Sequence, residues 1–494
     1  MKRLTAWTVA ALLAGLGLAG IARGDVVIHL KNGVEVRVPV SPGDVSSITF
    51  EQGGKPAAQV QPAAPPKQAE AQPAQSAPAQ SAPVSVPVKV AGPSTGYDEA
   101  PLSAAEMKEA ASGPALPGAS EFRGDAFAKG GADQPGGSGR IVHVGKGKEY
   151  QRFGDVASSL QSGDVVEIEG GPDLNDFAEI TASNITIRGV HGRPHFRASV
   201  EPPNAKAMWV ISGDNVTVDN IEISGVSVPD DNGAAIRAEG GKLVVKNCYF
   251  HHNQFGFLSA NGPEQEITIA NSEIAYNLRK DNYAHGIYIG HIRKFTLIDS
   301  YVHHNHRGHE VKSRAAETLI LYNRLTDEDG VGSYLVDAPN CGNTYIIGNV
   351  LQKGANAENY TAIAYGAEGC KGAGYIFYVG NNTYVNSLGH GPMVKNHSGD
   401  VGLMQNNLIV GADLYQGSMN TKNNLQTALS DLVNPAAYDY RLKAGSAAID
   451  AGAAPGKLGG VDLTPASEYV QPMKLAKRPV NGRIDIGAYE YTGK

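Results

Sequence analysis

The sequence predicts an all-β protein whose main domain is a right-handed parallel β-helix, and three features carry this prediction. Short apolar strands recur along the chain at a regular step from about residue 141 onward. An Asn or Asp recurs at one place in the repeat. The 60 glycines and 28 prolines, with only 18 % charged residues, are typical of a turn-rich β protein rather than a helical one.

The repeat is clearest in six segments that begin at Val216, Leu243, Ile267, Phe295, Leu319 and Tyr345. Their fifth places, with two less regular later copies, hold Asn220, Asn247, Asn271, Asp299, Asn323, Asn349, Asn382 and Asn406. Successive steps are 24 to 33 residues. Coils stacked about 4.8 Å apart would let each inward amide hydrogen-bond its copy on the next coil and satisfy a buried bend. Leucine-rich repeats need a helix per repeat, and β-propellers need about 40 residues, so neither fits.

The regions around the repeat divide the chain further. Residues 1–24 have the basic start, apolar run and small-residue end of a secretory signal, so we expect a periplasmic or secreted protein without membrane insertion. Residues 25–52 predict a small β-hairpin module with an Asn-Gly turn and a third strand at 46–50, a candidate for binding an unknown partner. Residues 53–139 form a Pro, Ala, Gln and Gly-rich linker.

The β-helix is expected over residues 140–428, followed by a C-terminal tail over 429–494 that packs on the last coils. The stretch Asp439-Tyr-Arg-Leu-Lys-Ala-Gly-Ser, with the later Arg478-Pro and Asp485-Ile-Gly-Ala-Tyr, resembles the closing segment of bacterial right-handed β-helix proteins. Cys341 and Cys370 should meet on stacked coils as a disulfide, while Cys248 is a candidate apolar filler.

One short region differs in charge from the rest of the chain. The net charge of −7 favours neither nucleic acid nor an anionic membrane as a partner. Residues 279–314 nevertheless hold seven Lys or Arg residues against three acids, and six of the 14 histidines. This local basic, imidazole-rich surface predicts a polyanionic ligand. His303 and His304 match His251 and His252 two coils earlier. The alternative to ligand binding is therefore that these four histidines are structural features of a repeated turn.

The candidate site centres on the strand around Val311. If Val311 points inward, Glu310 and Lys312 project together onto the outer face, and His309 lies inward or at the bend. Tyr288 and Asp337 would flank Lys312 on the neighbouring coils. We expect substrate contacts from five residues: Arg307, His306, Asp337, Tyr334 and Tyr365. An ordinary salt bridge between Glu310 and Lys312, and a turn-capping role for Asp337 before Pro339, are the alternatives.

The stretch Glu310-Val-Lys312-Ser313-Arg314, followed by the strand that ends at Asn323, resembles polysaccharide lyase family six, the chondroitinase B and alginate lyase group. The resemblance implies that Lys312 removes the C5 proton of a uronic acid. It also implies Ca²⁺ that neutralises the adjacent carboxylate, with Glu310 as the first metal ligand. Family members carry an Arg on the coil after the Lys, where this chain has Asp337, so either another residue such as Arg314 replaces it or the chain is a different enzyme on a related scaffold. The region also resembles exported β-helix proteins of bacterial exopolysaccharide systems.

The leading hypothesis is therefore an exported lyase that cleaves an acidic polysaccharide by β-elimination. The base would be Lys312, with its pKa lowered by Arg314 and burial, and the acid would be Tyr288, His285 or His309. A C5-epimerase on the same scaffold and a non-catalytic exopolysaccharide-binding or assembly protein are the alternatives. A hydrolase of the polygalacturonase type should cluster its aspartates, but Asp327, Asp329 and Asp337 are scattered.

Overall fold

The computed structural model describes residues 24–29, 35–40, 139–280 and 283–493. Residues 1–23 of the expected signal segment, the third strand of the N-terminal module and residues 53–138 of the linker lie outside the described residues. In the N-terminal unit, β1 (Gly24–His29) pairs antiparallel with β2 (Glu35–Val40), with Val26 opposite Val38. The Asn-Gly turn between them lies outside the described residues. Within the described part of the chain, no helix is long and apolar enough to cross a membrane.

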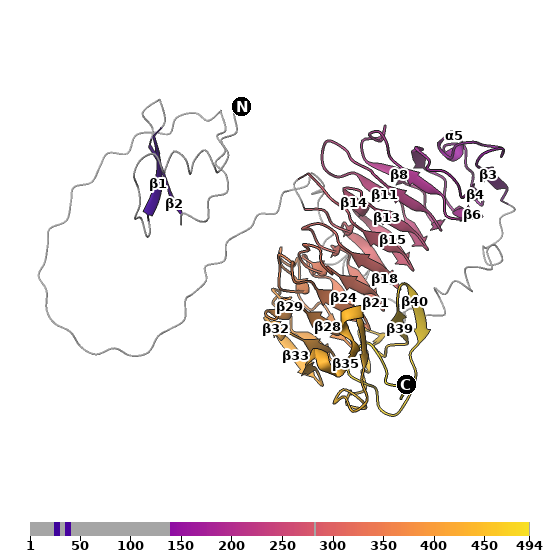
Figure 1. Cartoon of the computed structure of the whole chain (residues 1–494). Coiled ribbons are helices and arrows are strands. Elements are labelled where there is room, and N and C mark those ends of the chain that lie inside the picture. The colour runs from indigo at the N-terminus through magenta and orange to yellow at the C-terminus, as the bar shows by residue number, and fades with distance from the viewer. Residues whose placement is uncertain (1–23, 30–34, 41–138, 281–282, 494) are drawn as a thin grey trace, which may run out of the picture. The chain divides into compact units, whose positions relative to one another are not determined.

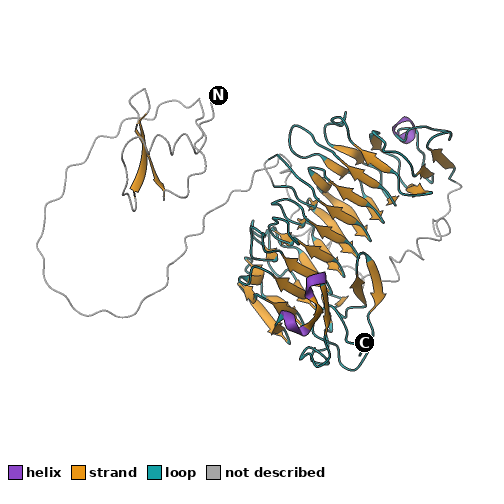
Figure 2. Cartoon of the chain, in the orientation of Figure 1, coloured by secondary structure: helices purple, strands orange, loops and turns teal. Residues whose placement is uncertain are grey.

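The second unit is a parallel β-helix built from three long sheets, which we call S1, S2 and S3 (Figures 1 and 2). Each coil adds one strand to each sheet in the same order, so neighbours in a sheet are one coil apart in sequence. This arrangement confirms the predicted fold class.

The twelve strands of S1 are, in sheet order, β3 (Ile141–Val144), β4 (Val165–Glu169), β6 (Thr186–Val190), β9 (Val216–Asp219), β12 (Lys242–Lys246), β15 (Gly262–Ala270), β18 (Ile292–Ile298), β21 (Glu317–Leu321), β24 (Asn343–Ile347), β27 (Phe377–Gly380), β30 (Gly402–Gln405) and β33 (Met419–Lys422). The ten strands of S2 are β7 (His195–Arg197), β10 (Glu222–Ser224), β13 (Tyr249–His251), β16 (Glu273–Ala275), β19 (Tyr301–His303), β22 (Arg324–Thr326), β25 (Val350–Lys353), β28 (Thr383–Asn386), β31 (Leu408–Val410) and β34 (Leu425–Thr427). The ten strands of S3 are β5 (Ala178–Ile180), β8 (Ala207–Ile211), β11 (Ala234–Ala238), β14 (Phe255–Ser259), β17 (Ile287–Ile289), β20 (Val311–Ser313), β23 (Val336–Ala338), β26 (Ile363–Tyr365), β29 (Pro392–Asn396) and β32 (Asp413–Gln416).

The core is a set of apolar columns that run from coil to coil along the inside. Because side chains alternate across a strand, every second residue of S1 points inward and lies over its partner on the next coil. One such column is fully buried and consists of Val218, Val245, Ile269, Leu297, Ile320, Ile346, Val379 and Met404. The outward side chains of successive coils are in register in the same way, so they also form columns on the surface.

The predicted asparagine ladder exists, but the sequence alignment placed part of it one residue too early. Strand β18 pairs with β21 so that Phe295 lies opposite Thr318, not Leu319. Five of the aligned residues, Asn220, Asn247, Asn271, Asp299 and Asn406, occupy the bend before the ladder with φ between 43° and 58°. This left-handed conformation suits Asn and Asp, which explains their recurrence there.

The inward ladder itself occupies the following position. The backbone N–H and side-chain amide of Asn323 both donate to Asn349 Oδ1, at 2.8 and 3.1 Å. Asn349 donates to Asn382 in the same way. The Ser300 and Ser272 hydroxyls continue the column toward the N-terminus, and buried Cys248 ends it. The role predicted for Asn323, Asn349 and Asn382 is therefore confirmed.

A second buried ladder runs along the bend that follows S2. Asn253 accepts from the backbone of Val226 and donates its own backbone N–H to Asn277, whose backbone and amide donate to Asn305. The next acceptor in this column is the Glu310 carboxylate, which takes the Asn305 backbone N–H and side-chain amide.

Few helical turns occur in the described residues: α5 (Gly154–Ala157), η1 (Leu429–Asp431) and η2 (Pro435–Ala437). The tail forms the antiparallel pairs β35 (Leu432–Asn434) with β36 (Asp439–Leu442), β37 (Lys457–Leu458) with β38 (Val461–Asp462), and β39 (Ser467–Val470) with β40 (Lys474–Lys477). Apolar residues of the tail, among them Leu432, Leu442 and Ile486, pack against Val385 and Leu408 on the outside of S2. The tail thus covers coils rather than extending them.

We expect Asn349→Ala to destabilise the β-helix by about 1 to 3 kcal/mol, because it leaves two buried Asn323 donors without an acceptor. Urea unfolding followed by circular dichroism measures the change. Asn356→Ala, at an exposed loop position, is the control and should change the free energy of unfolding by less than about 0.5 kcal/mol. Equal effects of both substitutions would contradict the role of the ladder.

Candidate functional site

The candidate site lies on the outer face of S3, where β17, β20 and β23 are adjacent. Tyr288 is in register with Lys312, and Lys312 with Asp337, so the three side chains form one outward column. The alternate residues Ile287 and Val311 are fully buried inside the coils. The sequence-based placement of Tyr288, Lys312 and Asp337 on one face agrees with this register.

Two cations of this face hold one carboxylate between them. Lys312 Nζ lies 2.7 Å from Glu368 Oε1, and Arg314 Nη1 lies 2.6 Å from Glu368 Oε2. Burial of Glu368 opposes its ionisation, but the two cations outweigh burial and hold its pKa at about 2. The Lys312 and Arg314 side chains are only 11 % and 12 % exposed, whereas that of Glu368 is 44 % exposed. The anion therefore sits at the solvent side of a buried cation pair.

Glu368 belongs to the connection that follows β26, and a disulfide fixes this connection. Cys370 is bonded to Cys341 with their Cα atoms 5.2 Å apart, which confirms the predicted pairing. The backbone N–H of Glu368 also donates to the Pro339 carbonyl. Both contacts tie the acid to the turn that follows β23.

Arg314 connects the cation pair to Tyr288. Its Nε donates to Tyr288 Oη at 3.0 Å, and its Nη1 donates to Asn340 Oδ1. The guanidinium carbon and Lys312 Nζ lie 5.7 and 6.0 Å from the Tyr288 ring centroid. Tyr288 is 7 % exposed, so its phenol is held in place by the two cations that surround it.

Two stacked histidines support the column from its other side. The His285 and His309 ring centroids are 4.8 Å apart, and the Tyr334 ring lies 5.1 Å from His309. His285 Nδ1 accepts the His309 backbone N–H, and His309 Nδ1 accepts the Tyr334 backbone N–H. Burial, with the nearby cation Lys312 adding to it, lowers the pKa of both rings well below 6.5. Both rings are therefore neutral, with the proton on Nε2.

Asp337 is the buried acid of the column. Its Oδ2 lies 3.3 Å from His309 Nε2 and 3.7 Å from Lys312 Nζ, and its side chain is 4 % exposed. Burial raises the pKa of Asp337 to about 6, although Lys312 and Arg314 pull it down. Asp337 therefore positions His309 and Lys312. This role goes beyond the turn-capping role that was the alternative for Asp337.

The expected position of Glu310 is wrong. Glu310 precedes β20 at the bend, and its side chain is fully buried rather than beside Lys312 on the outer face. It ends the second Asn ladder, near the buried ion pair in which Lys353 Nζ lies 2.6 Å from Asp327 Oδ2. Burial and the Asp327 charge raise the pKa of Glu310 well above 4.5. A carboxyl group that is inaccessible to solvent and already accepts two hydrogen bonds from Asn305 does not fit a Ca²⁺ ligand, and we derive no step through calcium.

Other expected contacts are also placed elsewhere. Tyr365 points into the coil, where its ring stacks on Phe377 at 4.1 Å and its hydroxyl donates to the Gly342 carbonyl, so it cannot touch a ligand on the outer face. His306 and Arg307 lie in the connection before β20, and the Arg307 guanidinium pairs with Glu358, which is not part of the Lys312 and Arg314 cluster. Tyr334 does join the site through His309.

Sequence reasoning gave no role to Glu368 or Asn340. Both lie in connections between strands, where strand alternation carries no information about direction. The available signal was the cysteine pair, because Glu368 is two residues from Cys370 and Asn340 immediately precedes Cys341.

Comparison with known proteins identifies the scaffold. Residues 170–351 match the family model described as "Right handed beta helix region". Among solved structures, pectate lyase Pel9A is similar, with a TM-score of 0.49 and 16 % identity over 72 % of this chain and 98 % of that one. A pectin methylesterase from Aspergillus niger has a TM-score of 0.30 and 12 % identity over 60 % of this chain and 88 % of that one. No curated protein matches the sequence. Together with the three sheets, the family match establishes a right-handed parallel β-helix.

We expect the stability of the protein to depend on pH through Asp337. Because its pKa is raised from 3.8 to about 6, the folded state binds this proton more tightly than the unfolded state. The resulting contribution is full below pH about 4 and is lost as the pH rises to about 6. Asp337→Asn should remove this loss, as measured by urea midpoints across that range. Asp413→Asn, at an exposed position, is the control, and an unchanged pH profile in Asp337→Asn would contradict the assignment.

Proposed function

We propose that the outer face of S3 around Lys312, Arg314 and Tyr288 is the active site of an exported lyase that cleaves a uronic-acid polysaccharide by β-elimination. The observation that carries this proposal is the Glu368 carboxylate held by Lys312 and Arg314, beside a phenol that Arg314 also contacts. Export rests on the signal-like segment at residues 1–24. A binding role for the N-terminal module toward an unknown partner remains a prediction.

The cation pair suits the carboxylate of a uronic acid. A C5 proton is only weakly acidic while the adjacent carboxylate is negative, because removing the proton adds a second negative charge. A bidentate arrangement of Lys and Arg on that carboxylate offsets the charge. In our proposal the sugar carboxylate replaces Glu368 between Lys312 Nζ and Arg314 Nη1, without a metal at this position.

Tyr288 is the group that would move the proton. The Arg314 Nε–H donates to its oxygen, which is the direction of hydrogen bond that stabilises a deprotonated phenol. Deprotonated Tyr288 takes the C5 proton, the C5 electrons form the C4–C5 double bond, and the C4–O4 bond breaks. The electron pair of that bond stays on O4, which receives the proton back from Tyr288. The catalyst is thereby restored and the product carries an unsaturated sugar end.

The structure also favours different roles from those that the family resemblance implies. Lys312 Nζ lies beside two carboxylates, Glu368 and Asp337, which suits a charged ammonium that binds an anion more than a neutral base. His285 and His309 use Nδ1 to accept backbone N–H groups and are placed to support Asp337. We therefore assign proton transfer to Tyr288, and positioning to His285, His309 and Asp337.

We expect Tyr288→Phe to lower lyase turnover by at least about 100-fold, because it removes the proton-transfer group and keeps the ring. The assay is the ultraviolet absorbance of unsaturated product with alginate, polygalacturonate, chondroitin and bacterial exopolysaccharides. Tyr249→Phe, on the face of S2, is the matched control and should retain full activity. Lys312→Ala should also be inactive, whereas Lys148→Ala, which removes a partly exposed ion pair with Glu169, should be active.

The products separate the alternatives. Uptake of deuterium at C5 without chain cleavage would identify an epimerase instead of a lyase. Binding of the polymers without either change would identify a non-catalytic binding protein. Full activity in Tyr288→Phe would contradict the assigned proton path.

Glu368 should compete with the substrate for the cation pair. Glu368→Gln keeps the shape of the side chain and removes its charge, so we expect uronate oligosaccharides to bind at least about fivefold more tightly. Calorimetry with an oligosaccharide that carries the carboxylates measures this change, and Glu358→Gln is the control because Glu358 pairs with Arg307. Weaker binding to Glu368→Gln would show that this acid assists the ligand and does not stand in for it.

A further inference from the structure

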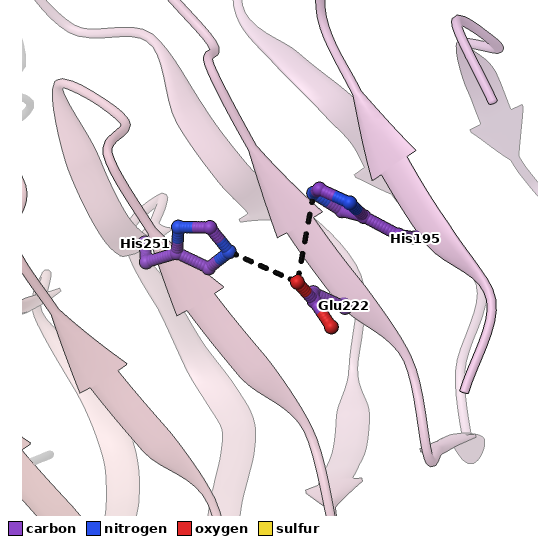
Figure 3. Close-up of side chains that lie close together, drawn as sticks. All are labelled: His195, Glu222 and His251. Carbon is purple, nitrogen blue, oxygen red and sulfur yellow. Dashed lines mark hydrogen bonds and ion pairs between the residues drawn. The ribbon is translucent and has the colours of Figure 1, made fainter. Parts of the chain in front are cut away.

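A separate cluster of metal-binding side chains lies on the outer face of S2, on the strands β7, β10 and β13 (Figure 3). His195 and Glu222 occupy the same column on neighbouring coils, and His251 lies two residues further along its strand on the next coil. His251 Nε2 is 3.2 Å and His195 Nε2 is 3.7 Å from Glu222 Oε1. All three ligand atoms lie within 4.8 Å of one another.

We propose that His195, Glu222 and His251 form a site for a divalent transition-metal ion of the Zn²⁺ class, which joins three successive coils. Ligand atoms about 2.0 Å from a tetrahedral ion lie about 3.3 Å from one another, and the two distances to Glu222 bracket this value. Two imidazoles and one carboxylate favour Zn²⁺ and its neighbours over Ca²⁺ or Mg²⁺, which bind all-oxygen sites.

The second nitrogen of each imidazole already has a partner that orients the ring. His195 Nδ1 lies 2.9 Å from Asp173 Oδ1, and His251 Nδ1 lies 2.7 Å from His252 Nδ1. A carboxylate behind a metal-binding imidazole is the usual arrangement in zinc sites, because it fixes the tautomer with Nε2 free for the ion. As Figure 3 shows, both rings turn toward the Glu222 carboxylate.

The cluster is open to solvent on one side. The side chains of His195, Glu222 and His251 are 18 %, 24 % and 14 % exposed, which leaves a path for an ion and a coordination position for water. Ser224 precedes His251 by one coil in the same column, and its Oγ lies 2.7 Å from His195 Nε2, so an ion bound there would replace this hydrogen bond.

The repeat provides an internal comparison. Two coils later, His303 Nε2 lies 3.2 Å from Glu273 Oε1, and His303 contacts His304 as His251 contacts His252. In that copy the place of His195 is taken by Tyr249, and the place of Ser224 by Ala275. The His303 pair thus lacks a third ligand. The repeated turn therefore explains a pair of adjacent histidines beside a glutamate, as in both copies. It does not explain His195, whose Nδ1 lies 2.9 Å from Asp173 Oδ1 and which has no counterpart in the later copy.

The experiment uses the full chain after treatment with a chelator, with Zn²⁺ binding measured by calorimetry and Co²⁺ binding by visible absorption. We expect one ion per chain, at least about tenfold weaker binding in His195→Ala and in Glu222→Gln, and a smaller loss in Asp173→Asn. The melting temperature should rise with Zn²⁺ in the wild type and not in His195→Ala.

His303→Ala is the matched control, because it removes the equivalent histidine of the two-ligand copy, and we expect it to bind Zn²⁺ like the wild type. Circular dichroism shows whether each variant retains its β structure, and Glu222→Gln preserves shape in case an alanine variant does not fold. Absence of binding, or equal binding in wild type, His195→Ala and Glu222→Gln, would overturn the proposal. A loss in His303→Ala as large as in His195→Ala would also overturn it.

Discussion

The stacking of successive coils in one register is the constraint on which the rest of the structure depends. Backbone hydrogen bonds between coils fix the spacing, and the inward Asn323, Asn349 and Asn382 amides fix the bend at one edge of S1. A shift of one residue would turn each inward side chain outward, so the buried columns and the ladder enforce the same register. Residues that lie one coil apart in sequence thereby become neighbours on the surface.

Both proposed sites consist of outward side chains that the register brings together from successive coils. Tyr288, Lys312 and Asp337 come from three consecutive coils of S3, and His195, Glu222 and His251 come from three consecutive coils of S2. A rigid repeated backbone holds such groups without dedicated loops. On S3, burial and charge act in opposite directions on the two acids. Asp337 is buried enough for its pKa to rise to about 6, while Lys312 and Arg314 keep that of Glu368 at about 2. The exposed acid is thus the tightly held anion and the buried one is close to neutralisation.

The sequence predicted those features that depend on periodicity. The repeat, the β-helix, the Tyr288 column and the disulfide follow from residue spacing, and the structure contains them. The ladder was partly misplaced because Asn serves two purposes at adjacent positions, in the left-handed bend at Asn247 and in the inward column at Asn349. Glu310 was misplaced because it lies at the bend before β20, where strand alternation no longer sets direction. Glu368 lies in a connection fixed by a disulfide, so its contact with Lys312 across 56 residues had no periodic signal.

The central claim is that Lys312 and Arg314 bind the carboxylate of an acidic sugar where Glu368 now lies. A crystal structure of the Tyr288→Phe variant with a bound uronate oligosaccharide tests it most directly. The account predicts a sugar carboxylate between Lys312 Nζ and Arg314 Nη1, Glu368 displaced toward solvent, and C5 facing the ring of residue 288. An oligosaccharide bound on another face, with the Glu368 bridge intact, would contradict it.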